Sequence, residues 1–430
     1  MAGADTNALS GLAKDVYEPG ISEGVNNSFP LAEEFPLEQV DWKGGLGTKW
    51  AHHHGRNTSP FFAREDSAYP VAGNQTSSQG RIDMRKLIAR IRMTEEAMED
   101  LVSSEASFKN GMTDEKTRIV DDISRREEQY LSMDGRGVLA LIDSGSSGTT
   151  IELDAPGNIT GDDFGNRFID VGMILATINP ANGALRSNIV TVTAVSADGS
   201  DVTVSADPSW TENDYVVHAA NASITSTLDT SFEAGYWGLP SLIDDGTNRD
   251  NYFGILRSQV PSLQSYVVGS VGAMSIDVAQ RTADVVFQRL GGIINLMVMH
   301  PSRRREFIKL QEADRRYVGA SLMNPDPGTK AFKQGDLTLG EVPIKALRTA
   351  PLNQVYFMDT AKMGAKRYVA QSGKFMDRDG SVWMREGTGA NARHAYEATY
   401  FCRKQYFMKA PAMCARWDGV SGTLVVVRDL

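Results

Sequence analysis

The sequence predicts an α+β fold from which several segments extend beyond any single hydrophobic core. Three observations predict it: a helical apolar pattern before residue 131, a series of short strand-like segments between residues 139 and 250, and a turn-rich stretch that is too long for an ordinary loop. Of the 430 residues, 41% are hydrophobic and 23% are charged, which is typical of a folded protein. Because a single core stops growing at about 250–300 residues, this length favours more than one domain.

Residues 1–45 are predicted to form an N-terminal arm. After one short helical pattern that ends at Pro19, apolar residues such as Phe29 and Trp42 are scattered among prolines and glycines. So few apolar side chains cannot bury enough surface to offset the entropy that is lost when the segment becomes ordered. We therefore expect the arm to lie on another surface.

Residues 46–93 are predicted to form an extended loop flanked by strands. Its middle, residues 54–75, is rich in turn residues. Two limbs of about 20 residues each would reach roughly 60 Å at about 3.3 Å per residue, and loops of such length are uncommon inside a compact domain. On the return limb, residues 81–93, the apolar alternation changes phase after Met84, which predicts a β-bulge.

Residues 94–142 are predicted to contain one long helix. Apolar residues spaced by 4, 7, 4 and 7 positions form an eleven-residue repeat, which keeps a narrow stripe on one face of a nearly straight helix. Gly135 and Gly137 are expected to end the helix. The predicted core stripe consists of Phe108, Met112, Ile119, Ile123 and Tyr130.

Residues 143–240 are predicted to form an acidic β-rich insertion. Between residues 139 and 250 the chain has 3 Arg and no Lys against 16 Asp and Glu, a local net charge of −13. Turn signals separate the expected strands, which favours a small β-module or a pair of hairpins at an exposed position. The expected strands are 150–153, 173–178, 189–195, 202–204 and 215–218.

The remainder of the chain is predicted to be α/β in residues 241–350 and mainly β in residues 351–430. Ser275 can cap a helix that Gly291 ends, and Ser302 can cap a second helix that runs to residue 314. Between the two helices, residues 293–299 are expected to form a buried strand. The C-terminal strands are expected at 342–347, 355–358 and 396–408, with a hairpin turn at residues 379–380.

Catalytic and cofactor motifs are absent from the sequence. It has no phosphate-binding GxxxxGK[ST] loop, no HExxH and no GxSxG. The GxGxxA at 135–140 follows a helix, so a helix stop is favoured over a dinucleotide site, and the three histidines at 52–54 would alternate between strand faces, which suits a metal poorly. The adjacent acids at 162–163 and 244–245 leave a hydrolase as a rival reading. We predict that the protein is not an enzyme and holds no cofactor or metal.

The overall charge and the cysteine content restrict the partners and the compartment. A net charge of −10 disfavours general binding to nucleic acid or to an anionic membrane. No run of 18 apolar residues is present, which argues against a membrane span. Cys402 and Cys414 cannot form a disulfide framework for a chain of this length, and no signal peptide is visible. We therefore expect a soluble protein that is made in a reducing cytoplasm.

Several stretches resemble the major capsid proteins of tailed bacteriophages, which have the Hong Kong 97-like fold. The similar stretches are DVYEPGI and NNSFPL within residues 15–31, HGRNTSPFFAREDSAYPVAGNQ at 54–75, WGLPSLIDDG at 237–246 and MVMHPSRRREFIKL at 297–310. After the long helix the family pattern Leu-x-Gly-Asp-Gly-x-Gly-x-Leu-Ala is matched by residues 131–140, with Met133 in place of the first glycine. The order of parts also matches: arm, extended loop (E-loop), spine helix in a peripheral domain (94–142), axial domain (241–350), and a C-terminal return (351–430) to the peripheral domain.

The resemblance implies that the parts extending from the core contact neighbouring subunits. In the extended loop the expected contact residues are Trp50, His54, Arg56, Arg64 and Glu65, and in the arm they are Tyr17, Phe29, Leu31 and Phe35. The arm would tie capsomers together from beneath, and the stripe of the spine helix would form the core of the peripheral domain.

The resemblance further implies a subunit of an icosahedral phage head that assembles into pentamers and hexamers around double-stranded DNA. The implied partners are other copies of the chain, a portal protein, a separate scaffolding protein and possible decoration proteins. The virion capsid would be assembled in the cytoplasm of a bacterial host, without sequence-specific DNA binding or a membrane. The alternative is an encapsulin-type compartment, which has the same fold but encloses an enzyme.

Overall fold

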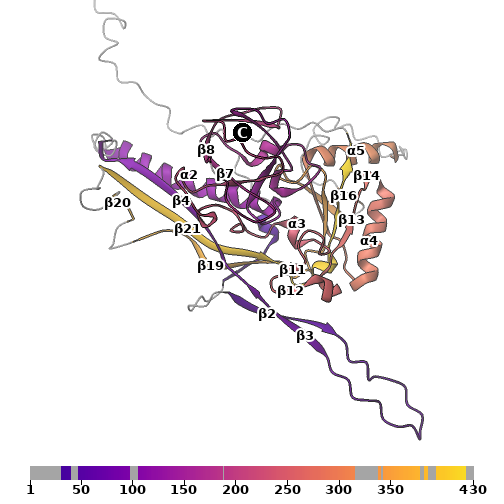
Figure 1. Ribbon diagram of the computed structural model, residues 1–430. Coiled ribbons are helices and arrows are strands. Elements are labelled where there is room, and N and C mark those ends of the chain that lie inside the picture. The colour runs from indigo at the N-terminus through magenta and orange to yellow at the C-terminus, as the bar shows by residue number, and fades with distance from the viewer. Residues whose placement is uncertain are drawn as a thin grey trace, which may run out of the picture.

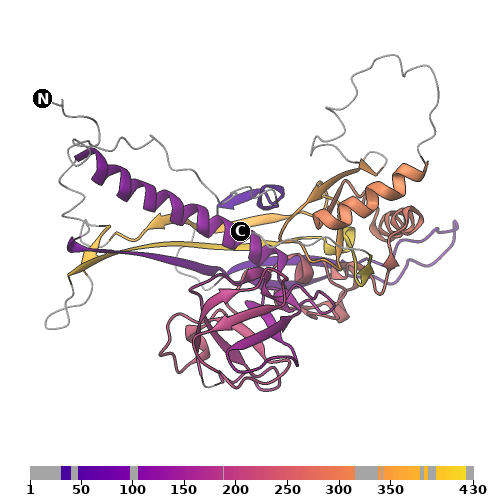
Figure 2. The ribbon, with the colours of Figure 1, turned by 90° about the horizontal axis from the view of Figure 1, so that it is seen from above.

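The computed structural model describes residues 31–39, 47–96, 105–186, 188–314, 338–339, 342–377, 382–385 and 394–422. The elements form a long sheet beside a long helix, a β-barrel, a second sheet with two helices, and a hairpin that projects away from all of these (Figure 1). Seen from above, the barrel forms a lobe on one side of the long sheet (Figure 2). Loops of the barrel contact the region of the second sheet, for example through the hydrogen bond from the Leu352 amide to Asp162.

The long sheet joins distant parts of the chain. Its strands are β1 (Leu37–Gln39), β19 (Lys366–Phe375), β21 (Ala395–Phe407) and β20 (Met384–Arg385), in that order, and β4 (Arg85–Thr94) pairs antiparallel with β21 along its whole length. Helix α2 (Glu105–Ser132) lies beside β4 and β21. Of the predicted stripe, Ile119, Ile123 and Tyr130 are buried, whereas the side chains of Phe108 and Met112 lie outside the described part of the structure.

Two glycines end α2 where we expected. Gly135 and Gly137 have φ values of +82° and +76°, in the left-handed region that glycine tolerates best. A Cβ atom at Gly137 would also lie 1.8 Å from the carbonyl oxygen of Ser231. The GxGxxA stretch therefore serves as a helix stop followed by strand β5 (Val138–Ile142).

The acidic insertion is a closed six-stranded barrel. The strand order is β10 (Tyr215–His218), β5, β6 (Thr150–Asp154), β9 (Asp201–Val204), β8 (Val190–Val195) and β7 (Ile174–Ile178), and β7 pairs with β10 to close it. The predicted strand positions hold to within a residue. Two expectations are corrected: the module is not a pair of hairpins, and it starts at β5, before residue 143, because β5 pairs with both β6 and β10.

The second sheet combines the region 241–350 with the C-terminal region. Its order is β13 (Tyr266–Val268), β22 (Ala415–Trp417), β18 (Val355–Met358), β15 (Leu296–Met299), β17 (Val342–Ala346) and β16 (Thr338–Leu339). The C-terminal region therefore does not return only to the long sheet, because β18 and β22 lie inside this one. Four short strands form two further pairs: β11 (Asn251–Tyr252) with β12 (Ile255–Leu256), and β14 (Gly272–Ala273) with β23 (Val420–Ser421).

The two helices of this region follow the predicted pattern with one correction. The Ser275 hydroxyl accepts a hydrogen bond from the Val278 amide and caps α4 (Ile276–Leu290), and Gly291 ends the helix at φ +72°. Helix α5 (Pro301–Asp314) begins one residue before Ser302. Ser302 is therefore inside the helix and is not its cap. A short helix, α3 (Leu239–Leu242), packs near the end of α2.

Candidate inter-subunit surface

The extended loop is a hairpin that projects from the body. Strands β2 (Thr48–Gly55) and β3 (Thr76–Ile82) pair antiparallel from Thr48↔Ile82 to Gly55↔Thr76. Beyond the paired part the two limbs continue away from the rest of the molecule and meet at the tip (Figure 1). A turn at the tip is closed by a 3.1 Å hydrogen bond from the Ser67 amide to the Arg64 carbonyl oxygen.

Large apolar side chains of the tip are exposed to solvent. The exposed fractions are 52% for Phe61, 103% for Phe62, 99% for Tyr69 and 90% for Val71. A monomeric soluble protein seldom exposes so many large apolar side chains together. The tip therefore has the character of a surface that another molecule covers.

The root of the hairpin, in contrast, is packed against the body. Trp50 is 9% exposed, and its ring centroid lies 4.8 Å from that of Phe407 and 6.1 Å from that of Tyr252. Gly80 lies so close that a Cβ atom there would be 2.3 Å from the Trp50 Nε1 and 2.5 Å from the Phe253 carbonyl oxygen. The expectation that Trp50 contacts a neighbouring subunit is corrected, because its indole is buried within its own chain.

The other predicted loop residues remain available. Arg56, Arg64 and Glu65 are exposed, and His54 is half-buried with its Nε2 2.9 Å from the Ser78 hydroxyl. Their contacts with neighbouring subunits stay predictions. The histidines do not converge on a metal, and the described ranges contain no group of three side chains that could bind one.

The return limb is divided between two structures. Strand β3 ends at Ile82, and β4 begins at Arg85 as part of the long sheet. The change of phase after Met84 is therefore the break between two strands and not a bulge within one. The extended loop is correspondingly shorter than 46–93, since residues 85–94 pair with β21.

The end of the arm is part of the chain's own core. Leu31 and Phe35 are 0% and 1% exposed, and the Phe35 ring packs edge-on against Tyr406 with centroids 5.2 Å apart. Strand β1 then pairs parallel with β19. The prediction that Leu31 and Phe35 contact neighbouring subunits is thus corrected. Tyr17 and Phe29 lie outside the described residues.

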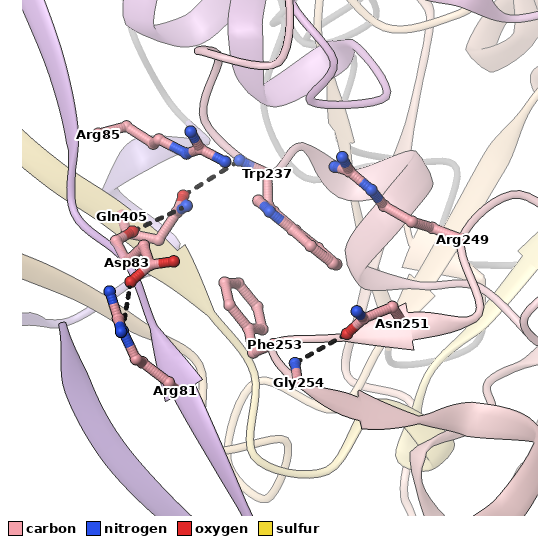
Figure 3. A pocket seen from close by; sticks show the side chains of 9 residues that line it. All are labelled: Arg81, Asp83, Arg85, Trp237, Arg249, Asn251, Phe253, Gly254 and Gln405. Atoms are coloured by element: carbon pink, nitrogen blue, oxygen red, sulfur yellow. Dashed lines mark hydrogen bonds and ion pairs between the residues drawn. The ribbon is translucent and has the colours of Figure 1, made fainter. Parts of the chain in front are cut away.

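A pocket of about 500 Å³ opens at the root of the hairpin. Figure 3 shows Arg85 and Arg249 on opposite sides of it, with Trp237 and Phe253 between them. The Arg81 Nε lies 2.7 Å from an Asp83 oxygen, and an Arg249 Nη2 lies 2.6 Å from a Glu233 oxygen. Burial, and next the nearby Arg249, lower the pKa of Arg85. The remaining lining residues are Asn251, Gly254 and Gln405.

One acid of each adjacent pair that suggested a hydrolase, Asp162 and Asp244, forms an ion pair in the interior. Asp244 is 0% exposed and lies between two buried arginines, with an oxygen 3.3 Å from the Arg257 Nη1 and another 3.2 Å from the Arg416 Nη2. Asp162 pairs with Arg167 at 3.1 Å and accepts the Leu352 amide. Both carboxylates are occupied in ion pairs that hold the interior together.

Comparison with known proteins gives structural likeness only. No protein-family model matches the chain, and no curated protein matches it. The chain is similar to the Cyanophage A-1(L) capsid asymmetric unit, with a TM-score of 0.55, 8% identity, and coverage of 97% of this chain and 99% of that one. It is also similar to the capsid of a native GTA particle, with a TM-score of 0.52, 11% identity, and coverage of 98% and 100%.

The chain has the Hong Kong 97-like capsid fold. Both likenesses run over nearly the full length of each chain, so the predicted fold is confirmed. A holo-SrpI encapsulin complex from Synechococcus elongatus matches at a TM-score of 0.46 with 10% identity, too weakly to support an argument. Within the described ranges, none of the helices combines the length and the apolar character that crossing a membrane requires.

Proposed function

We propose that this chain is a shell subunit, the major capsid protein of a phage-type icosahedral head that encloses double-stranded DNA. The observation that carries the proposal is the extended loop, which has a root packed into the body and a tip whose apolar side chains are exposed. The capsid fold supports it. In this proposal the loop lies on the adjacent copy, and pentamers and hexamers form the shell.

The energy for such an assembly is available at the tip. Burying a large apolar side chain contributes about 1.5–3 kcal/mol, and Phe62, Tyr69 and Val71 are each at least 90% exposed. A standard interface buries about 1,600 Å² in total, which a draped hairpin together with the body contacts would reach. Because every subunit repeats the contact, moderate interfaces add up to a stable shell.

The charge of the chain suits a container for DNA. Tight nonspecific binding of duplex DNA needs clustered Lys and Arg that release counterions, whereas this chain has a net charge of −10. A shell of such subunits would enclose the genome without binding it tightly. We expect a portal protein, a separate scaffolding protein and possible decoration proteins as partners, and assembly in the bacterial cytoplasm before the shell becomes part of the virion.

Electron microscopy of the expressed full-length chain tests the assembly. We expect closed shells from the wild type and from Leu228→Ser, a control that removes a 91% exposed leucine beside the barrel. The double variant Phe62→Ser/Tyr69→Ser should give no closed shells. A stable monomer at micromolar concentration, or normal shells from the double variant, would contradict the proposal.

The content of the shell is tested separately. Particles from the natural source should protect double-stranded DNA from nuclease. Particles that contain a specific protein and no protected DNA would favour the encapsulin-type compartment instead. Purified capsomers should not bind duplex DNA tightly at about 0.15 M salt.

A further inference from the structure

The pocket at the loop root contains two buried guanidinium nitrogen atoms that lack acceptors within the described residues. The Arg85 Nε and the Arg249 Nη1 are buried, and neither has a hydrogen-bond partner among the described residues. Leaving a buried donor unpaired costs about 1–3 kcal/mol, more when the group is charged. Arg249 is partly neutralised by Glu233, whereas Arg85 makes no ion pair within the part of the chain that the structure describes.

Arg249 is held against a rigid aromatic support. The Trp237 and Phe253 rings stack with centroids 4.2 Å apart and are 7% and 6% exposed. The Arg249 guanidinium lies 4.5 Å from the centroid of the Trp237 ring. Arg85 starts strand β4, which is paired along its length. Because the Arg249 side chain and the backbone of Arg85 are already fixed, an oxyanion entering between the arginines would meet a largely preorganised site.

The loop tip carries the matching groups. Within residues 47–82 the only acidic residues are Glu65 and Asp66, and both are exposed at the turn that Ser67 and Arg64 close. Two neighbouring carboxylates on one turn can accept hydrogen bonds from two arginines. The tip lies roughly 30 Å beyond the paired strands, at about 3.3 Å per residue, and points away from its own pocket (Figure 1).

We propose that the Glu65–Asp66 turn of one copy binds in the pocket at the loop root of another copy, where its carboxylates accept hydrogen bonds from Arg85 and Arg249. This inference rests on the proposed function, because it needs a second copy of the chain. Each copy then supplies one tip and one pocket, and a head-to-tail contact of this kind generates a ring when the rotation closes.

Charge reversal tests the contact. Arg85→Glu and Glu65→Lys/Asp66→Lys should each weaken association of the copies by at least about tenfold, and the combined variant should recover to within about threefold of the wild type. Lys86→Glu, the next residue on the same strand, is the matched control and should have a smaller effect. Thermal unfolding of each variant shows whether it is folded. Together these variants form a double-mutant cycle, which measures the coupling energy between pocket and tip. Should Arg85→Glu fail to fold, the cycle of Arg85→Gln with Glu65→Gln/Asp66→Asn measures this coupling without reversed charges.

Mixing the two defective variants gives a second test. A copy with Arg85→Glu has an intact tip, and a copy with Glu65→Lys/Asp66→Lys has an intact pocket. Neither should associate alone, because the tip and pocket of each variant then carry like charge. A mixture should associate with the two variants alternating, because the acidic tip of the first fits the intact pocket of the second, and the reversed tip of the second fits the reversed pocket of the first. Strictly additive effects in the cycle, together with no pairing in the mixture, would overturn the inference while wild-type shells still supported the proposed function. If the wild type formed no multimers, both would fail.

Discussion

Replacing Glu128 with glutamine should stabilise the protein above pH 7 and leave its stability nearly unchanged at pH values below about 4.5. Glu128 lies near the end of α2 and is 5% exposed. Burial raises the pKa of its carboxyl group from 4.5 to about 7, against the opposing effect of the backbone N–H groups of Leu31 and Ala32. The ionisation of this carboxyl group therefore makes the stability of the folded protein depend on pH.

The magnitude follows from the pKa difference between the folded and unfolded states. A rise from 4.5 to about 7 corresponds to roughly 3 kcal/mol, since one pKa unit is worth about 1.36 kcal/mol. Well below pH 4.5 the carboxyl group is neutral in both states, so it costs nothing. Between the two pKa values the unfolded chain ionises first and the folded state loses relative stability. Above pH 7 the whole penalty is present, and glutamine avoids it because it carries no charge.

Denaturant unfolding of the wild type and Glu128→Gln between about pH 5 and pH 8 measures this difference. The stabilisation by glutamine should increase across that range toward about 3 kcal/mol. Glu96→Gln, which removes an exposed carboxylate, controls for the loss of one negative charge. A difference between Glu128→Gln and the wild type that does not change with pH would refute the reasoning.

Two further substitutions test the interior. Gly80→Ala should lower the free energy of unfolding by about 1–3 kcal/mol, because the new Cβ would lie 2.3 Å from the Trp50 Nε1. Gly269→Ala is the control and should change it little, because a Cβ atom there would have nothing within 4 Å. Thermal unfolding distinguishes the two variants, and equal effects would contradict the packing argument. Asp244→Asn should cost about 3–5 kcal/mol, because the buried Arg257 loses its counter-charge, while Arg416 keeps an ion pair with Asp418. Asp245→Asn, at its more exposed neighbour, should cost less than about 1 kcal/mol. A small loss for Asp244→Asn in urea unfolding would mean that the buried arginines find other acceptors.

Elements whose signals are local were predictable from the sequence. The positions of β10 and β18 were predicted to the residue, at 215–218 and 355–358. The start and end of α4 followed from a serine that caps it and a glycine at positive φ. Each of these features depends on residues within one turn or one strand, so no knowledge of the distant chain is needed.

Features that depend on distant partners were not predictable in the same way. The phase change after Met84 was visible, but its meaning depends on β21, about 300 residues further along the chain in the register Arg85↔Lys404. Leu31 and Phe35 looked unpartnered because the Tyr406 ring that covers Phe35 is equally remote. The closure of the barrel rests on the pairing of β7 with β10, which no local pattern specifies.

The net charge of the chain and the charge at a contact govern different events. Charges separated by more than about 8 Å are largely screened at physiological salt. The arginines at the loop root therefore act on a carboxylate in their own pocket, regardless of the −13 carried by the stretch from 139 to 250. The overall −10 acts instead on a polyanion that approaches many subunits at once. One acidic chain can thus bind its own copies through local basic groups and still repel the DNA that a shell would contain.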